Sequence, residues 1–548
     1  MRQGAGNVVI AGELALNISE VGERMSLLLS QSQVPGVPTA DQRSADRIAR
    51  RIRWHQVVRP HVVIWTIVAC STLLAIFHLC TASIWYDEAL TLLTVSGQAQ
   101  TDFAPGLDPF QPSANLVKIT GELYQQDVHP PLYFWTLALW RVVLGESLEA
   151  ARALSALFLA GTLLLLHRLA SDLNMQRPWV PSAMFAASGV GLQYAYNARP
   201  YAMAAFLIVL TLVLAQRKSR WTGICGAAAI ATHYFAALCV APILAISFWK
   251  EWKRDRLWAW ATISSFAIGV APLLLLLRVH LTARPLQYPG FGPPHKEFYA
   301  LLKSAIETAL PNSGLPGWGF AWFTAATIAC LGIWHCYRQR KAAAPLLYGG
   351  FLLGFFLMAV ATQKSIVKMP GDYYLGIGAP LLALLIGFGL QTLPRVNPLF
   401  VLLIVAGMAS ANPIIKSTDY RAIAERMRMQ CSDCTVVVGN GYAGAVPASV
   451  LYETKRMKII AMNAGETADQ VFARAGNDEF VLFVKTNEPP TVAAEDQFVL
   501  SHRAVWKDGY FEVYPQRRSN PDPQSIHGAT MIGGNSAPPQ FARASVSR

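Results

Sequence analysis

Trp85-Tyr86-Asp87-Glu88 stands directly after the first long apolar run of the chain, Val62 to Ile84. Carboxylates are costly inside hydrocarbon, so two acidic residues at the end of a membrane span form either a solvated rim or part of a site that faces water. Neighbouring residues on a helix point about 100° apart, so the two side chains can hold different partners. We interpret Asp87 and Glu88 as candidate catalytic residues at a membrane surface.

The composition around this stretch is that of a polytopic membrane protein. Of 548 residues, 53% are apolar and 14% are charged, whereas charged residues make up roughly 25% of an ordinary soluble protein. The net charge of +13 does not indicate a nucleic-acid groove, because the basic residues cluster between apolar runs, as in cytoplasmic loops. We therefore expect membrane lipids as partners and no nucleic acid.

The distribution of basic residues also predicts the topology. The arginines between Arg47 and Arg59 precede the first span, which holds the N-terminus in the cytoplasm and sends Asp87 to the other side. The apolar run from Pro131 to Leu144 is short for a span, which needs about 20 residues. If this run is an interfacial helix, the chain has eleven spans, and every strong basic cluster lies on the cytoplasmic side. If the run crosses the membrane instead, every later basic cluster lies outside. The positive-inside bias therefore favours an interfacial helix.

These patterns predict an all-α polytopic membrane protein with about eleven transmembrane helices, additional interfacial helices and a small C-terminal α/β soluble domain. Alternating helix-like and strand-like segments near the end of the chain, such as Thr435–Val438, indicate that soluble domain. We expect a mostly disordered cytoplasmic arm, a transmembrane catalytic domain, a non-cytoplasmic α/β domain and a disordered tail, over residues 1–59, 60–411, 412–516 and 517–548.

Several cations lie on the non-cytoplasmic side, against the usual charge bias. Arg199 is in Tyr194-Ala195-Tyr196-Asn197-Ala198-Arg199-Pro200-Tyr201, and the others are Arg152, His233, Lys364 and Lys368. Guanidinium groups are suited to a bidentate grip on phosphate. Cations beside carboxylates at one membrane face suggest an anionic headgroup as ligand, although a snorkelling arginine is the alternative for Arg199.

Taken in order, six segments resemble the family-39-like group of membrane glycosyltransferases with the GT-C fold, which includes protein O-mannosyltransferases and the transferase that adds aminoarabinose to lipid A. The resemblance covers roughly residues 60 to 411. It is carried by Trp85-Tyr86-Asp87-Glu88, His129-Pro130-Pro131-Leu132-Tyr133-Phe134-Trp135, Arg152-Ala153-Leu154-Ser155-Ala156-Leu157, Tyr196-Asn197-Ala198-Arg199-Pro200-Tyr201, His233-Tyr234-Phe235, and Asp372-Tyr373-Tyr374 through Pro380.

The resemblance implies inverting transfer of a hexose or pentose from a polyprenyl-phosphate donor to a lipid, glycan or protein acceptor outside the cytoplasm. It places Asp87 at the reaction centre, with Glu88 beside it. We expect Arg199, Lys364 and Lys368 to bind the donor phosphate, and we expect substrate contacts from His129, Tyr133, Asn197, Tyr201, His233 and Tyr373.

Two departures from the family pattern concern ligands. Asn197 stands where the family often has an acid, and Asp372 stands where related enzymes often have a basic residue before the tyrosines. The first departure leaves open whether a divalent metal takes part, and no other cofactor is indicated. Cys431 and Cys434 lie outside the apolar runs, where a local disulfide is favoured over zinc or a redox role.

A transporter or flippase of a lipid-linked or anionic solute is the alternative class. Such proteins usually place their charges near the bilayer midplane, whereas the charges here gather at span ends. We therefore expect an enzyme in the cytoplasmic membrane of a bacterium, with its active site facing the periplasm or exterior.

Overall fold

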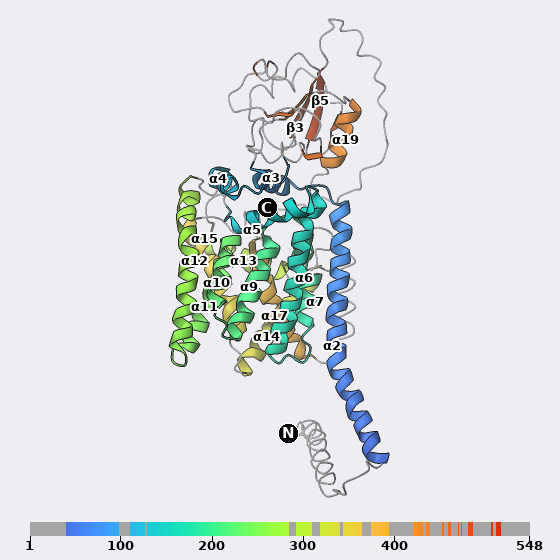
Figure 1. Cartoon of the computed structure of the whole chain (residues 1–548), viewed down its shortest axis with the longest axis vertical. Helices are drawn as coiled ribbons and strands as arrows, with labels where there is room; N and C mark the ends of the chain where they lie inside the picture. Colours follow the sequence, from blue (N-terminus) through green and yellow to red (C-terminus); the bar gives the residue numbers. More distant parts are fainter. Residues whose placement is uncertain are drawn as a thin grey trace, which may run out of the picture. The chain divides into compact units, whose positions relative to one another are not determined.

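A bundle of apolar helices makes up most of the structure (Figure 1). The chain divides into two compact units, residues 1–63 and 64–548, and every site considered below lies in the second unit. The computed structural model describes residues 40–97, 110–126, 129–283, 292–308, 318–339, 343–363, 374–393, 420–430, 435–438, 452–453, 459–461, 470, 473, 480–485, 506–507 and 511–516.

The helices have the following bounds: α2 Ala40–Thr81, α3 Tyr86–Ser96, α4 Leu116–Gln126, α5 Leu132–Leu144, α6 Leu148–Asp172, α7 Val180–Ala187, α8 Gly189–Tyr196, α9 Tyr201–Gln216, α10 Thr222–Thr232, α11 Ala236–Glu251, α12 Arg256–Ala283, α13 Pro294–Glu307, α14 Trp318–Arg338, α15 Ala343–Thr362, the 3₁₀ turn η1 Gly376–Gly378, α17 Ala379–Gln391 and α19 Tyr420–Gln430.

Among the described residues, four helices are long and apolar enough to cross a membrane, and one bent pair raises this number to five. The four segments are His61–Thr81, Leu148–Asp172, Arg256–His280 and Ala344–Thr362. The chain is therefore an integral membrane protein with several candidate spans. The run expected to be interfacial is α5, a helix of 13 residues, which is shorter than the roughly 20 residues that a span needs.

The apolar region from Trp179 to Tyr196 is divided into α7 and α8 at Ser188. Ser188 has an extended backbone, and its hydroxyl accepts a hydrogen bond from the Gly191 amide at 2.9 Å, which caps the start of α8. The chain then turns by 115° between α8 and α9. Pro200 directly precedes α9, where its fixed φ suits the start of a helix. The turn exposes backbone groups of residues 197–199 to side chains from other helices.

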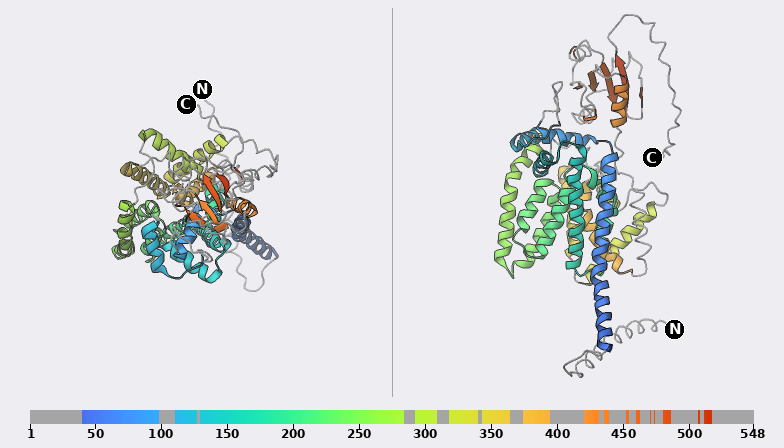
Figure 2. Two further views of the ribbon diagram at one scale, coloured as in Figure 1. Left: turned by 90° about the horizontal axis from the view of Figure 1, so that it is seen from above. Right: turned by 45° about the vertical axis from the view of Figure 1, so that its right-hand side comes forward.

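Helices α3 and α4 run across one end of the upright helices, and two further views agree on this arrangement (Figures 1 and 2). Helix α3 ends at Gly97, whose φ of +64° is left-handed and suits glycine. We call this end of the bundle, where α3 begins, the site end.

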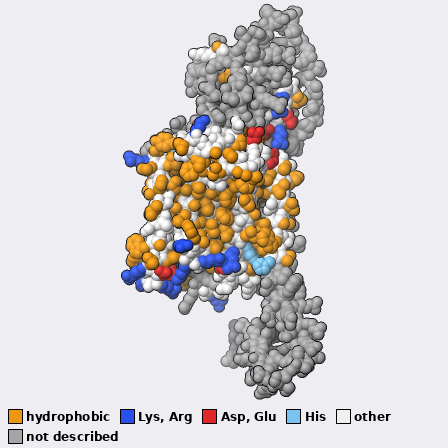
Figure 3. Space-filling model, in the orientation of Figure 1, with side chains coloured by type: hydrophobic (Ala, Val, Ile, Leu, Met, Phe, Trp, Pro, Cys, Tyr) orange, Lys and Arg blue, Asp and Glu red, His pale blue; other side chains and the backbone are white. Residues whose placement is uncertain are grey.

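Ion pairs join α6, α9 and α11 at the opposite end. The guanidinium of Arg217 lies 3.1 Å from Asp172, and the Lys218 ammonium lies 2.6 Å from Glu251. Most of the visible Lys and Arg side chains gather along this margin, below a broad hydrophobic band (Figure 3). Exposed basic residues here include Arg168, Arg217, Lys218, Lys250, Lys253 and Arg254. We call this end the basic end.

A five-stranded sheet lies in the last part of the described chain. Its strands are β1 Thr435–Val438, β2 Ile459–Ala461, β3 Phe480–Lys485, β4 Trp506–Lys507 and β5 Phe511–Gln516, in the spatial order β2-β1-β3-β5-β4. Strands β2, β1 and β3 are parallel, and β5 pairs antiparallel with β3 and β4. Residues 1–39 of the arm expected over 1–59, the expected tail at 517–548, and Cys431 and Cys434 lie outside the described residues, whereas residues 40–59 belong to α2.

Candidate functional site

Glu88 joins three segments that are far apart in the sequence. Its carboxylate is fully buried and accepts four hydrogen bonds. Oε2 accepts from the Trp85 amide at 3.0 Å and from Arg152 Nη2 at 2.7 Å, and Oε1 accepts from Arg152 Nε at 2.9 Å and from the Ala198 amide at 2.8 Å. Glu88 therefore satisfies one amide at the start of α3 and another in the turn between α8 and α9, where irregular backbone needs a partner inside the protein.

Arg152, near the start of α6, completes this network with all five of its N–H donors. Besides the two bonds to Glu88, Nη1 donates to the carbonyls of Leu79 and Ala82 at 3.0 and 2.9 Å, and Nη2 donates to the carbonyl of Ser83 at 2.9 Å. Leu79 and Ala82 lie at the C-terminal end of α2, whose last carbonyls have no partner within the helix. The outward arginine noted in the sequence is thus a structural clamp between α2, α3 and α6.

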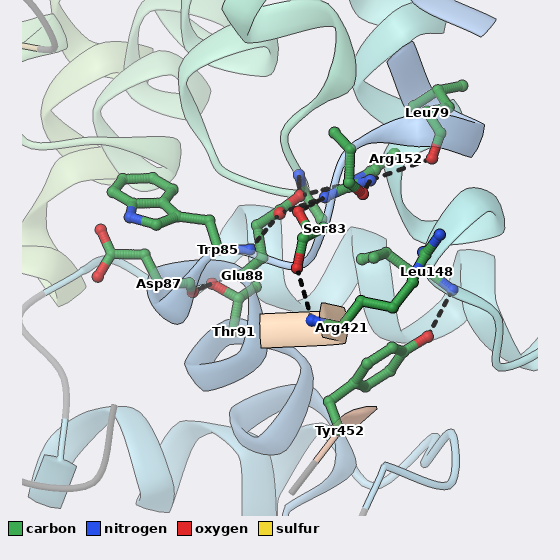
Figure 4. A network of polar contacts seen from close by, with 12 residues as sticks. Leu79, Ser83, Trp85, Asp87, Glu88, Thr91, Leu148, Arg152, Arg421 and Tyr452 are labelled. Atoms are coloured by element: carbon green, nitrogen blue, oxygen red, sulfur yellow. Dashed lines mark hydrogen bonds and ion pairs between the residues drawn. The ribbon is translucent and has the colours of Figure 1, made fainter. Parts of the chain in front are cut away.

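Asp87 points away from this network (Figure 4). Its side chain is 22% exposed, and its Oδ2 lies 3.6 Å from Nη2 of Arg199. The two adjacent carboxylates therefore have different surroundings, as their positions on a helix predict. The buried Glu88 is committed to the fold, whereas Asp87 is accessible and paired with one cation.

Arg199 comes from the turn between α8 and α9 and is almost fully buried. Its Nη1 donates to the Thr91 hydroxyl at 2.8 Å and to the Asp87 carbonyl at 3.4 Å. Its Nη2 lies 3.4 Å from Nε2 of His129. Because guanidinium has no acceptor, this last contact is a hydrogen bond when His129 Nε2 carries a lone pair. The turn thus holds one cation against the first turns of α3 and the segment before α5.

Aromatic and imidazole rings form one side of the site. The rings of His129 and His233 lie 5.5 Å apart, and the His233 ring lies 5.3 Å from that of Tyr201. Tyr201 stacks on Tyr194 with 5.2 Å between ring centroids, and Tyr374 lies 6.1 Å from His233. The turn after α10, the start of α9 and the segment before α5 therefore meet beside Arg199.

Tyr133 and Asn197 are placed close to the same charged groups. Tyr133, on α5, is fully buried, and burial raises the pKa of its hydroxyl; the charge of Arg199 lowers this pKa to a smaller extent, and the charge of Glu88 raises it. Asn197 is buried, and its carbonyl accepts from the Arg199 amide at 2.8 Å. Both residues therefore lie within the cluster that the sequence predicted.

Two residues from the C-terminal part of the chain contact this end of the bundle. The Arg421 amide lies 3.4 Å from the hydroxyl of Ser83, and the Tyr452 hydroxyl accepts from the Leu148 amide at 3.0 Å. Burial raises the pKa of Tyr452 to about 12, so the phenol stays neutral at physiological pH. Tyr452 therefore caps the first turn of α6 at Leu148, four residues before Arg152 (Figure 4).

The structure brings together Asp87, Glu88, His129, Tyr133, Asn197, Arg199, Tyr201 and His233 of the predicted site. Lys364, Lys368 and Tyr373 lie outside the described residues. Within the described part of the chain, no group of three His, Cys, Asp or Glu side chains could hold a metal ion.

Sequence reasoning did not include Arg152 or Thr91 among the site residues. The sequence did point to Arg152, because the predicted topology places this cation on the non-cytoplasmic side, against the usual charge bias. Thr91 lies four residues after Asp87 on α3 and therefore on the same helical face. The role of Arg152 as a clamp could not be predicted, because the sequence does not show which residue ends α2 or which carbonyls are left without a partner there.

The fold and the site together define an integral membrane protein that has a charged, partly accessible site at one end of its helices. The structure is similar to ArnT from Cupriavidus metallidurans bound to undecaprenyl phosphate, at 14% sequence identity and a TM-score of 0.45, over 78% of this chain and 96% of that one. It is also similar to the Archaeoglobus fulgidus oligosaccharyltransferase in complex with Zn and sulfate, at 11% identity and a TM-score of 0.41, over 76% and 67% of the two chains.

No protein-family model matches the chain, and no curated protein matches it by sequence. At these identities and TM-scores the structural similarities are distant. The residues of the site therefore carry the functional argument.

Proposed function

We propose that this chain is a GT-C-type glycosyltransferase that moves a sugar from a polyprenyl-phosphate donor to an acceptor at the non-cytoplasmic face, with inversion. The observation that carries the proposal is the pairing of Asp87 with Arg199 at 3.6 Å, beside a second carboxylate that is fully consumed by structural hydrogen bonds. An accessible carboxylate can act on the acceptor, and a fixed cation beside it can bind the departing phosphate.

In this mechanism Asp87 takes the proton from the acceptor, or orients the acceptor for attack on the anomeric carbon. A base must lie within hydrogen-bond reach of the proton that it removes, and the partial exposure of Asp87 permits that approach. The bond between the anomeric carbon and the phosphate oxygen then breaks, and the phosphate leaves with the bonding electron pair.

Arg199 stabilises the negative charge that builds up on the leaving phosphate. Its two Nη2 contacts, at 3.4 and 3.6 Å, are longer than its bond to Thr91, so a phosphate oxygen can replace them at small cost. Preorganised charge of this kind is commonly the largest single catalytic contribution. Lys364 and Lys368 are proposed as further phosphate contacts, and Tyr373 as a substrate contact.

Glu88 and Arg152 are proposed as positioning residues instead of reacting groups. Their network fixes the start of α3 relative to the turn that carries Arg199, and it thereby sets the distance between Asp87 and Arg199. The proposal differs here from the sequence-based expectation, in which Glu88 stood beside Asp87 as a catalytic residue.

We further propose that the site end faces the periplasm or exterior and that the chain crosses the membrane eleven times. The gathering of exposed basic side chains at the opposite end supports this orientation. Helices α10 and α11, with 11 and 16 residues, are shorter than the roughly 20 residues that a span usually needs. The division into an arm, a catalytic domain, a soluble α/β domain and a tail belongs to the same proposal.

The experiment that tests this function uses purified protein in lipid nanodiscs and a panel of tritiated undecaprenyl-phosphate hexoses and pentoses. Native membranes that lack the protein supply the acceptors. We expect label to pass from the donor to a new covalent product only when the protein is present. Movement of intact donor across the bilayer of a proteoliposome without a new product would favour the transporter class instead.

A further inference from the structure

An open groove of about 470 Å³ lies between α4 and α5, a volume within the usual range for small-molecule sites. It is lined by Leu116, Val117, Thr120, Gly121, Tyr124 and Trp135. The Thr120 hydroxyl donates to the Leu116 carbonyl at 2.7 Å and accepts from Trp135 Nε1 at 3.0 Å. The polar atoms of Thr120 and Trp135 are thus paired within the protein, and the lining offers a ligand almost entirely apolar surface.

The groove lies beside the end of a candidate membrane span. His280, the last residue of the candidate span Arg256–His280, has its Nε2 3.2 Å from the carbonyl of Leu123 on α4. Helix α4 is therefore fixed to the end of a span. Amphipathic helices at this depth bury their apolar face at the boundary between headgroups and hydrocarbon, and tryptophan is enriched there.

The apolar surface continues beyond the groove. Val117 is 83% exposed, and α5 exposes Leu139, Val142, Val143 and Leu144. An apolar surface of this extent is unfavourable in water but is continuous with bilayer hydrocarbon. A groove that opens onto this surface admits a hydrocarbon chain from the same leaflet.

The position of the groove relative to the two reacting groups indicates which substrate it serves. Helices α4 and α5 both pack against α3, which carries Asp87, the group proposed to act on the acceptor. Arg199, proposed to bind the donor phosphate, comes from the turn between α8 and α9. The helices that line the groove thus pack against the helix that carries Asp87.

We propose that the acceptor is a lipid and that the groove between α4 and α5 holds one of its hydrocarbon chains. This inference rests on the proposed glycosyl transfer and adds the chemical class of the acceptor. The chain would hold the acceptor headgroup at the site end, so that its nucleophilic hydroxyl or phosphate reaches Asp87.

Gly121 provides a direct test, because a Cβ at this position meets no heavy atom within 4 Å. A Cβ at this position therefore enters open space, and Gly121→Leu adds an apolar side chain to the lining of the groove. Gly349, on α15, has the same open surroundings, so Gly349→Leu is a matched control for the gain of an apolar side chain. Val117→Asp is a second variant, which places a charge at the exposed mouth of the groove.

The assay gives wild-type protein a tritiated undecaprenyl-phosphate sugar and the total lipid extract of native membranes. We expect a labelled lipid product that loses its label to the aqueous phase after alkaline removal of its acyl chains. Gly121→Leu and Val117→Asp should raise the acceptor KM at least tenfold and leave hydrolysis of the donor in the absence of acceptor unchanged, and Gly349→Leu should match the wild type.

Label in a protein or a water-soluble glycan would overturn the lipid acceptor, while donor turnover would leave the glycosyltransferase proposal standing. Wild-type transfer by both groove variants would overturn the role of the groove. No donor turnover by the wild-type protein with any sugar of the panel would instead refute the proposed function on which the inference rests.

Discussion

Glu88 and Arg152 form a buried ion pair in which each of the five guanidinium N–H groups and each carboxylate oxygen is hydrogen-bonded within the protein. Such a pair repays its desolvation only when its geometry is good and its remaining hydrogen-bonding groups are satisfied. Both conditions hold here. The pair fixes the ends of α2, α3 and α6 and the turn before α9 in one arrangement.

Glu88→Gln should therefore reduce stability. Removing one partner of a buried pair leaves an uncompensated charge and typically costs about 3–5 kcal/mol. Thermal unfolding of the purified protein in detergent measures the change. The control is Glu307→Gln, which breaks a half-exposed pair with Lys303 and should cost less than about 1 kcal/mol. A Glu88→Gln variant as stable as the control would show that the network is not structural.

Asp87→Asn should abolish most of the activity and leave stability near that of the wild type. The amide keeps the shape of the side chain but cannot accept a proton, and general bases typically contribute about 10²–10⁴-fold to rate. Sugar transfer from the labelled donor measures the loss. Glu149→Gln removes an exposed carboxylate from the first turn of α6 and should retain wild-type turnover, and comparable turnover by Asp87→Asn would remove Asp87 from the mechanism.

Arg199→Lys should lower kcat/KM for the donor at least tenfold, which corresponds to about 1.4 kcal/mol of transition-state stabilisation. An ammonium cannot reproduce the planar fork that contacts Thr91, Asp87 and His129 at the same time. Steady-state kinetics with varied donor concentration measures the effect. Arg168→Lys, at an exposed position on the basic end, is the matched control, and equal kinetics for the two variants would contradict the phosphate role.

Single-cysteine labelling should place the two ends of the bundle on opposite sides of the membrane. Lys118→Cys, exposed on α4 at the site end, should react with an impermeant maleimide in intact spheroplasts. Lys253→Cys, exposed at the basic end, should react only after the membrane is opened. Both variants are compared with a parent whose native cysteines are replaced, and reaction of Lys253→Cys alone in intact spheroplasts would reverse the proposed orientation.

The sequence by itself determined the membrane class, the importance of Trp85 to Glu88, and most of the residues that meet at the site. These features depend on hydropathy, on the cost of charge in hydrocarbon and on local helix signals, all of which are readable along the chain. The short length of α5, 13 residues, was also readable from the sequence, because it is local information.

Only the tertiary structure decided how the surroundings of the two adjacent carboxylates differ. The sequence predicted that Asp87 and Glu88 can hold different partners, but it did not show which residues those partners are. Their difference arises because Arg152 and the Ala198 amide, 64 and 110 residues away from Glu88, converge on one carboxylate and leave the other partly exposed. The groove between α4 and α5 also depends on the tertiary structure, because its lining residues come from two separate helices. Contacts between residues so far apart leave no periodic pattern in the sequence, so they cannot be predicted from it.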